Sequence, residues 1–126
     1  MIVLDTHAWL WWVDAPRRLS PAARRAIERA EQIGVSTASV FELVGLTETR
    51  RIRIKSPTRT WVLNALAGDR IEPLPLTVEI AVDAAQLRFT GDAFDRIIYA
   101  TARAEQAQLV TRDERLRGFD AERTVW

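Results

Sequence analysis

Two short apolar runs that end near a carboxylate restrict most strongly what this chain can fold into. Met1–Leu4 is followed at once by Asp5, and Gln108–Thr111 is followed by Arg112 and Asp113. Apolar runs of this length are typical of strands buried on both faces, as in a parallel sheet. The first run leads into Ala8–Val13, where apolar residues have helical spacing. We therefore expect short strands that alternate with helices.

The rest of the chain predicts further helices and strands in the same alternation. Serine or threonine stands where it would cap a helix at four places, namely Ser20-Pro21, Ser39, Ser56-Pro57 and Thr77. A helix that ends at Gly34 should lead into a strand at Val35–Thr37, and Thr124–Trp126 should form the last strand. Ile71–Leu76 contains two prolines, which restrict it to an edge strand or an extended linker. This order predicts an α/β sandwich, a mostly parallel sheet flanked by helices, in a single domain of residues 1–126.

Composition excludes several classes of protein. The chain has no cysteine, so disulfides, zinc–thiolate sites and cysteine nucleophiles are excluded. No apolar run approaches the roughly 20 residues that span a bilayer, and the first residues lack the pattern of a signal peptide. We expect a cytoplasmic protein without membrane association. The net charge of +1 is uninformative, but every basic residue except Lys55 is arginine. This skew suits phosphate partners, and a codon bias would produce it equally well.

Gly91–Ala104 contains the most informative pair of carboxylates. The segment predicts a helix whose apolar stripe begins beside Asp92 and Asp95, which are three residues apart. Side chains at i and i+3 share one helix face, so both carboxylates can point the same way. The same pattern describes an ordinary helix start, in which Asp92 is the N-cap and Asp95 its capping-box partner. Both interpretations stay open for this segment alone.

Glu42 and Arg50–Lys55 also allow more than one interpretation. Glu42 lies within the apolar pattern of a helix predicted from Val40 to about Thr49. Its carboxylate either has a catalytic role, lies on the exposed face of the helix or completes a capping box with Ser39. Basic and apolar residues alternate in Arg50–Lys55, which puts the basic side chains on one side of an extended segment. The favoured interpretation is that such a strip keeps a sheet edge from pairing with strands of other molecules. The alternative is that it contacts nucleic-acid phosphate.

Four carboxylates stand at predicted strand ends or helix starts: Asp5, Glu42, Asp95 and Asp113. In a parallel sheet these positions open onto the same edge, where such folds bind ligands. Two unit charges about 4 Å apart repel by about 4 kcal/mol at an effective dielectric near 20, so a converging set needs a cation or shared protons. Carboxylate oxygens without cysteine suit Mg²⁺ or Mn²⁺. The implied chemistry is metal-assisted phosphodiester hydrolysis, and the least specific alternative is four unrelated helix caps.

Other phosphate chemistries fit these residues less well. Receiver domains and haloacid-dehalogenase-like phosphatases need a lysine near the aspartate, and the single lysine, Lys55, lies in the alternating segment. A glycine-rich loop ending in Lys-Ser/Thr is absent, which argues against a P-loop NTPase. His7 is the only histidine and has no accompanying nucleophile pattern. A direct role for His7, such as general base, is therefore the less favoured interpretation and stays open.

The sequence resembles the PIN-domain ribonucleases of the VapC toxin type. Ile2–Trp12 is similar to the first motif of one branch of that family, Phe41–Leu43 to the second, Asp92–Arg96 to the third and Val110–Glu114 to the fourth. Leu74–Thr77 is also similar to that branch. Each motif is weak alone, but all four occur in the family's order across nearly the whole chain. The branch commonly has proline at the position of Ala93 and a histidine shortly before Asp92, and this chain has neither.

The resemblance implies a Mg²⁺- or Mn²⁺-dependent endoribonuclease that acts on single-stranded or structured RNA. Its catalytic residues would be Asp5, Glu42, Asp95 and Asp113, with Asp5, Asp95 and Asp113 as metal ligands. Thr111 would orient metal-bound water and Asp92 would be an auxiliary acid. The family also implies a homodimer and a cognate antitoxin protein that occupies the active-site groove. A PIN-like domain that binds RNA or protein without cleaving is the alternative.

The five tryptophans are assigned mainly to packing. Trp9 and Trp12 are expected in the core. Trp11 and Trp61 are assigned to the core or to a protein interface ahead of stacking on unpaired bases.

Overall fold

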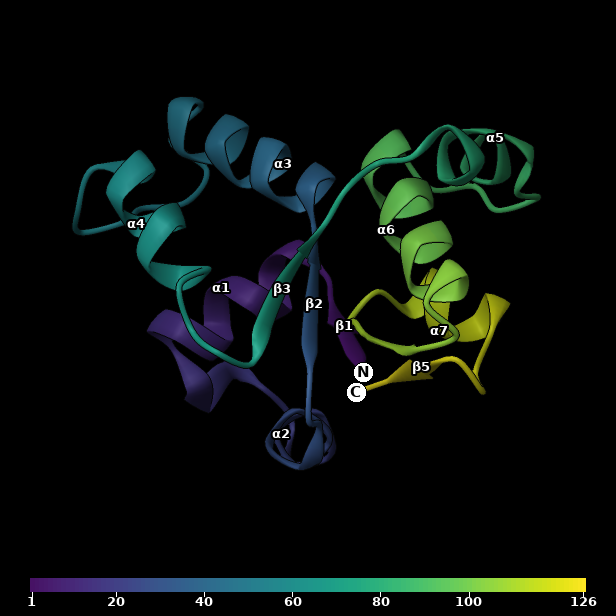
Figure 1. Ribbon diagram of the computed structural model, residues 1–126, viewed down its shortest axis with the longest axis horizontal. Coiled ribbons are helices and arrows are strands. Elements are labelled where there is room, and N and C mark those ends of the chain that lie inside the picture. Colours follow the sequence, from purple (N-terminus) through teal and green to yellow (C-terminus); the bar gives the residue numbers. More distant parts are fainter.

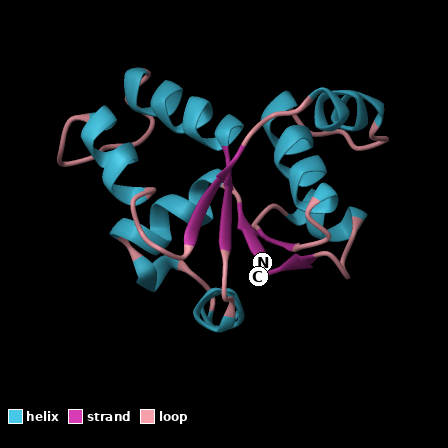
Figure 2. Cartoon of the chain, in the orientation of Figure 1, coloured by secondary structure: helices cyan, strands magenta, loops and turns pink.

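A five-stranded, fully parallel sheet forms the centre of the molecule, with strand order β3-β2-β1-β4-β5. The computed structural model describes all residues, 1–126. Its strands are β1 Ile2–Leu4, β2 Ile33–Ser36, β3 Ile71–Leu74, β4 Gln108–Val110 and β5 Thr124–Val125. Figure 2 shows the strands side by side with helices around them. The predicted α/β fold with a mostly parallel sheet is confirmed.

Seven α-helices and one short 3-10 helix, η1, connect the strands. They are α1 Thr6–Asp14, η1 Pro16–Arg18, α2 Pro21–Arg29, α3 Thr37–Glu48, α4 Thr58–Ala65, α5 Val78–Gln86, α6 Ala93–Ala104 and α7 Glu114–Phe119. In Figure 1, α1 to α4 lie to the left of and below the sheet, and α5 to α7 lie to its right. None of these helices is long and apolar enough to cross a membrane.

Alternation along β1 divides the core between the two faces of the sheet. Ile2 and Leu4 belong to a cluster that contains Trp9 and side chains of α2, α3 and α4. Val3 points the other way, into a cluster with side chains of α5, α6 and α7. Successive residues of a strand face opposite sides, so one run of three buried residues contributes to both clusters. Burial on both faces explains why the first run is uniformly apolar.

The helix that carries Glu42 begins earlier than the sequence predicts. Ser36, the last residue of β2, caps α3 by accepting a hydrogen bond from the Ala38 amide at 3.1 Å. Ser39 is buried in the first turn, and its hydroxyl has no hydrogen-bond partner. The predicted cap at Ser39 is therefore wrong, because the chain turns directly from strand into helix. The predicted helix end at Gly34 is also wrong, since Gly34 lies within β2.

Arg50–Lys55 forms no strand and begins with a turn and a bend, so the predicted sheet-edge strip is wrong. The predicted alternation is present, because the basic side chains are exposed and Ile52 and Ile54 are half-buried. The segment folds back on the end of α3, with Arg50 at a positive φ of 59°. Backbone amides of Arg51 and Ile52 donate to the Leu46 carbonyl at 2.9 and 3.3 Å, which satisfies the helix end. β3 occupies the edge of the sheet, as the prolines of Ile71–Leu76 predict.

Three of the tryptophans are buried in the first cluster, namely Trp9, Trp11 and Trp61. The Trp61 indole nitrogen donates to both carboxylate oxygens of Asp14, each at 3.0 Å. Trp12 packs only at the edge of the cluster. Trp11 and Trp61 are thus core residues, which agrees with the assignment to packing ahead of base stacking.

Candidate active site

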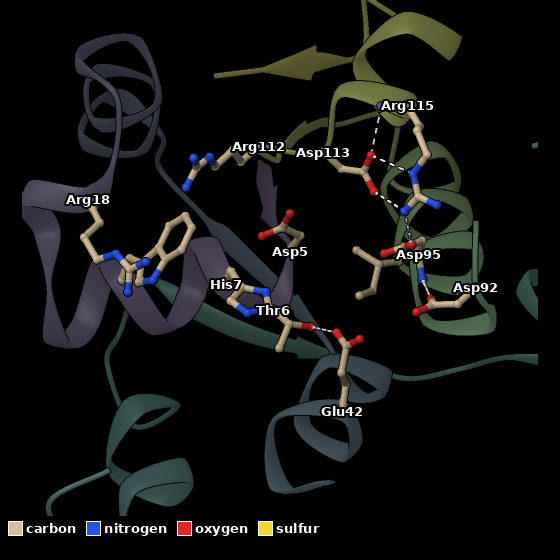
Figure 3. Close-up of a pocket in the computed structure, with 12 residues that line it drawn as sticks. Asp5, Thr6, His7, Arg18, Glu42, Asp92, Asp95, Arg112, Asp113 and Arg115 are labelled. Carbon is tan, nitrogen blue, oxygen red and sulfur yellow. Dashed lines mark hydrogen bonds and ion pairs between the residues drawn. The ribbon is translucent and has the colours of Figure 1, made fainter. Parts of the chain in front are cut away.

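Five acidic side chains line one cavity of about 550 Å³ at the carboxyl edge of the sheet. Figure 3 shows them arranged around Asp5. Asp5 follows β1, Asp113 follows β4 after two residues, Glu42 lies on α3, and Asp92 and Asp95 lie at the start of α6. The other lining residues are Thr6, His7, Trp11, Arg18, Ile98, Arg112 and Arg115. Parallel strands bring their carboxyl ends to one edge, so residues distant in sequence meet here.

Asp5 is held rigidly at the start of α1. Its carboxylate accepts a hydrogen bond from the Ala8 amide at 2.8 Å, so it is the N-cap that the sequence allows. Burial raises the pKa of Asp5 above its ordinary value, and a hydrogen bond with the Thr111 hydroxyl partly offsets this rise. The cap and the cavity position are compatible, because the carboxylate has a second oxygen.

Glu42 reaches the cavity from α3 and is oriented by Thr6. The Thr6 hydroxyl donates a hydrogen bond to Oε1 of Glu42, joining the start of α1 to the second turn of α3. Burial raises the pKa of Glu42, the Thr6 hydrogen bond lowers it, and the charge of Asp92 raises it further. The capping box with Ser39 does not form. Thr6 was missed from sequence, where its place beside Asp5 was the only signal.

Asp92 and Asp95 form the helix start that the capping interpretation describes, and both also line the cavity. Oδ1 of Asp92 accepts a hydrogen bond from the Asp95 amide at 2.9 Å. Burial, followed by the charges of Asp92, Asp113 and Glu42, raises the pKa of Asp95 to about 7. A carboxyl group with such a pKa gains or loses its charge near neutral pH, which is common at functional sites.

Arg115 connects Asp95 with Asp113 and was missed by the sequence analysis. Its Nη2 lies 2.9 Å from Oδ2 of Asp113 and 3.3 Å from Oδ2 of Asp95. Hydrogen bonding to Arg115 holds the pKa of Asp113 below its ordinary value. Arginine in the first turn of a helix opposes the helix dipole. That unfavourable position was the sequence signal that Arg115 pairs with acidic side chains.

The donor set suits a hard divalent cation. Carboxylate oxygens line one wall of the cavity, and the raised pKa values of Asp5, Glu42 and Asp95 indicate that the site favours fewer negative charges. Across the whole chain, however, no group of three histidine or acidic side chains is arranged to hold a metal ion. Arg115 lies between Asp95 and Asp113 instead. Metal ligation by Asp5, Asp95 and Asp113 stays a prediction.

The opposite wall of the cavity is basic and aromatic. The Arg18 guanidinium lies 4.5 Å from the centre of the Trp11 ring. Arg112 enters from the loop between β4 and α7, and His7 projects from α1 beside Trp11, with ring centres 5.6 Å apart. The cavity therefore has an acidic wall and a basic wall with Asp5 between them (Figure 3).

The sequence pattern that defines the PIN domain matches residues 2–122. The chain belongs to the PIN-domain family. Its match to the ribonuclease VapC22 of Mycobacterium tuberculosis is 42% identical over 129 residues, covering 99% of this chain and 98% of that protein. The resemblance inferred from the four motifs is thereby confirmed.

Two solved structures share the fold of this PIN domain. A toxin–antitoxin complex from Klebsiella pneumoniae matches with a TM-score of 0.71 and 20% identity, covering 100% of this chain and 97% of that one. Mycobacterium tuberculosis VapC20, described as a sarcin–ricin loop cleaving toxin, also matches with a TM-score of 0.71, at 14% identity, covering 95% of each chain. At these identities the matches show the arrangement of elements.

Proposed function

We propose that this PIN domain is a divalent-metal-dependent endoribonuclease toxin that hydrolyses phosphodiester bonds in RNA and is neutralised by a cognate antitoxin. The observation that carries the proposal is the gathering of Asp5, Glu42, Asp95 and Asp113 around one cavity. The 42% identity to a protein named as a ribonuclease supports the reaction class. The similarity in fold to a toxin–antitoxin complex supports the antitoxin partner.

In this proposal Asp5, Asp95 and Asp113 hold Mg²⁺ or Mn²⁺. When bound, such a cation lowers the pKa of water and neutralises charge on a phosphodiester. The protein's own contribution is orientation and charge. The Ala8 amide positions Asp5, and the Thr6 hydroxyl positions Glu42. Burial and the charges of its neighbours raise the pKa of Asp95 to about 7, so this carboxyl group gains or loses its charge near neutral pH.

The decisive experiment is cleavage of RNA by the purified chain. We expect cleavage of a mixed pool of oligoribonucleotides that stops with EDTA and returns with Mn²⁺. Asp5→Asn and Glu42→Gln should each lower the rate by at least about 100-fold, the scale seen when a preorganised group at a reacting centre is removed. Asp69→Asn is the matched control, since Asp69 is exposed and does not line the cavity.

The outcomes separate the proposed enzyme from the alternative. Full activity of Asp5→Asn would disprove the site assignment. RNA binding without cleavage under any of these metal conditions would support the alternative of a PIN-like binding domain. Circular dichroism of each variant confirms that a lost activity does not reflect a lost fold.

We also propose that the chain forms a homodimer in the cytoplasm. The support is a set of large apolar side chains that the monomer leaves exposed near the starts of α3 and α5. Phe41 is 73% exposed, Val78 is 77% exposed, and Val82, one turn along α5, is 50% exposed. The Phe41 ring stacks on Phe94 of α6, with ring centres 5.8 Å apart. Exposed apolar surface of this kind marks contact with another protein.

A further inference from the structure

Two arginines that line the active-site cavity have no acidic partner. Arg18 and Arg112 form no ion pair and no side-chain hydrogen bond, although five carboxylates line the same cavity. Arg115, the third arginine of the cavity, contacts Asp95 and Asp113. The acidic wall thus has its own guanidinium, and those of Arg18 and Arg112 keep their donors free.

Contacts on the basic wall keep Arg18 beside the cavity. Its guanidinium lies over Trp11, which is 5% exposed and also packs against Trp126 with ring centres 5.8 Å apart. A cation over an indole face is stabilised by the ring quadrupole without losing its outward-facing hydrogen bonds. The Trp11 ring therefore holds the Arg18 charge near the cavity and leaves it able to bind an anion.

Arg112 is carried by a backbone that is fixed on both sides. The Thr111 amide donates to the Val125 carbonyl at 3.2 Å, and the Asp113 amide donates to the Thr111 hydroxyl at 3.1 Å. These two hydrogen bonds fix the position of the Arg112 backbone. The Arg112 side chain extends along the cavity toward Arg18 (Figure 3). Arg112 is exposed, so solvent and ligands reach its guanidinium.

We propose that Arg18 and Arg112 form a phosphate-binding wall that holds the RNA backbone across the cavity from the carboxylates. The inference rests on the proposed function, because it names where that substrate lies. Carboxylates repel a phosphodiester, so a strand that enters this cavity needs cations on the other side to align it. Guanidinium groups suit this task because they pair with two phosphate oxygens at once. The arginines bind phosphates, and the carboxylates remain with the cation and the reacting bond.

Salt dependence of RNA binding tests the proposal without requiring cleavage. The probe is a fluorescently labelled single-stranded oligoribonucleotide, and anisotropy gives its affinity over a series of salt concentrations, in EDTA and again in Ca²⁺. Each phosphate contact contributes about −0.7 to the slope of log K against log salt for a single strand. Arg18→Ala combined with Arg112→Ala should therefore make the slope about 1.4 less steep. Affinity at low salt should fall by about tenfold or more.

Matched controls separate these contacts from general charge. Arg17→Ala combined with Arg117→Ala removes the same number of charges from η1 and α7, and neither residue lines the cavity. This control should keep a slope within about 0.3 of the wild type. Arg18→Lys with Arg112→Lys keeps both charges and should restore most of the slope. If the arginines had only a structural role, the double lysine variant would not recover the slope of the wild type.

Each outcome decides the inference. Equal slopes in the wild type and the double alanine variant would overturn it, as would the same loss in the Arg17 and Arg117 control or no salt-dependent RNA binding at all. A chain that binds RNA through these arginines but never cleaves it would refute the proposed function and leave the phosphate-binding wall standing. If the wild type cleaves RNA and the double alanine variant has the same slope as the wild type, the proposed function stands and the phosphate-binding wall is refuted.

Discussion

Asp95 couples the charge of the cavity to the stability of the protein. Its pKa of about 7 lies above the ordinary value of 3.8. Between these values the folded state holds a proton that the unfolded chain has released, so stability falls as pH rises through this window. Below about pH 4 both states are protonated, and the penalty is absent. Without divalent cations, the ionised Asp95 therefore destabilises the fold most above pH 7.

Asp95→Asn tests this coupling by removing the charge and keeping the shape. In EDTA at pH 7.5 we expect the variant to exceed the wild type in free energy of unfolding by about 1–3 kcal/mol, allowing for partial solvent exposure. The difference should shrink toward zero near pH 4. Urea unfolding at several pH values measures it, with Asp69→Asn as the control. A variant that is less stable at pH 7.5 would show that Asp95 is not strained by its neighbours.

Single residues also show where prediction from sequence stops. Asp5 and Asp92 were each expected either as helix caps or as site residues, and the structure shows that each caps a helix and lines the cavity. The two interpretations were never exclusive, because a carboxylate has two oxygens and the start of a helix is itself a polar edge. The catalytic role of Asp5 is a proposal that the cleavage assay decides.

Strand β2 contains a glycine, Gly34, that lies close to a side chain of the neighbouring strand β3. A Cβ atom added at Gly34 would lie 2.5 Å from Cδ1 of Leu74, a buried residue of β3. By contrast, a Cβ at Gly45, within α3, would meet no atom within 4 Å. One glycine is therefore required by a contact between strands, and the other is a weak point in a helix.

Alanine at these two glycines should have opposite effects on stability. Gly34→Ala should destabilise the fold by about 1–3 kcal/mol through overpacking against Leu74. Gly45→Ala should stabilise it by up to about 1 kcal/mol, because alanine favours the helix. Thermal and urea unfolding of both variants provide the measurement. A destabilised Gly45→Ala would indicate that this surface of α3 is occupied in solution.

Element boundaries were predictable where one local signal dominated. Ser20 and Thr77 cap α2 and α5 as expected. α3 differed because Ser36 and Ser39 are both plausible caps, and the pairing of β2 with β1 and β3 decides that Ser36 ends the strand. Arg50–Lys55 differed because its isoleucines pack on the core from a turn, which an alternating pattern does not distinguish from a strand.

For the whole molecule, the proposed homodimer gives a direct test. Val78→Asp places a charge on the exposed apolar surface, at a helix start where an acidic residue is tolerated. We expect sedimentation of the wild type as a dimer and a weakening of that dimer by at least about tenfold in Val78→Asp, as a buried unpaired charge requires. Leu63→Asp is the control, since Leu63 is 58% exposed on α4. A monomeric wild type would refute the homodimer.

The sequence by itself determined the fold class, the family and the four carboxylates at the sheet edge. The strand pattern, the helix caps and each motif depend on residues close together in the chain, so they can be recognised from the sequence. Only the tertiary structure decided the contacts that set the charge of the site. Arg115 contacts Asp95 across 20 positions of the chain, and Thr6 contacts Glu42 across 36. Arg18 and Arg112 line the same cavity as the carboxylates without pairing with them. Such contacts depend on how separate helices pack on the sheet, and no local preference specifies them.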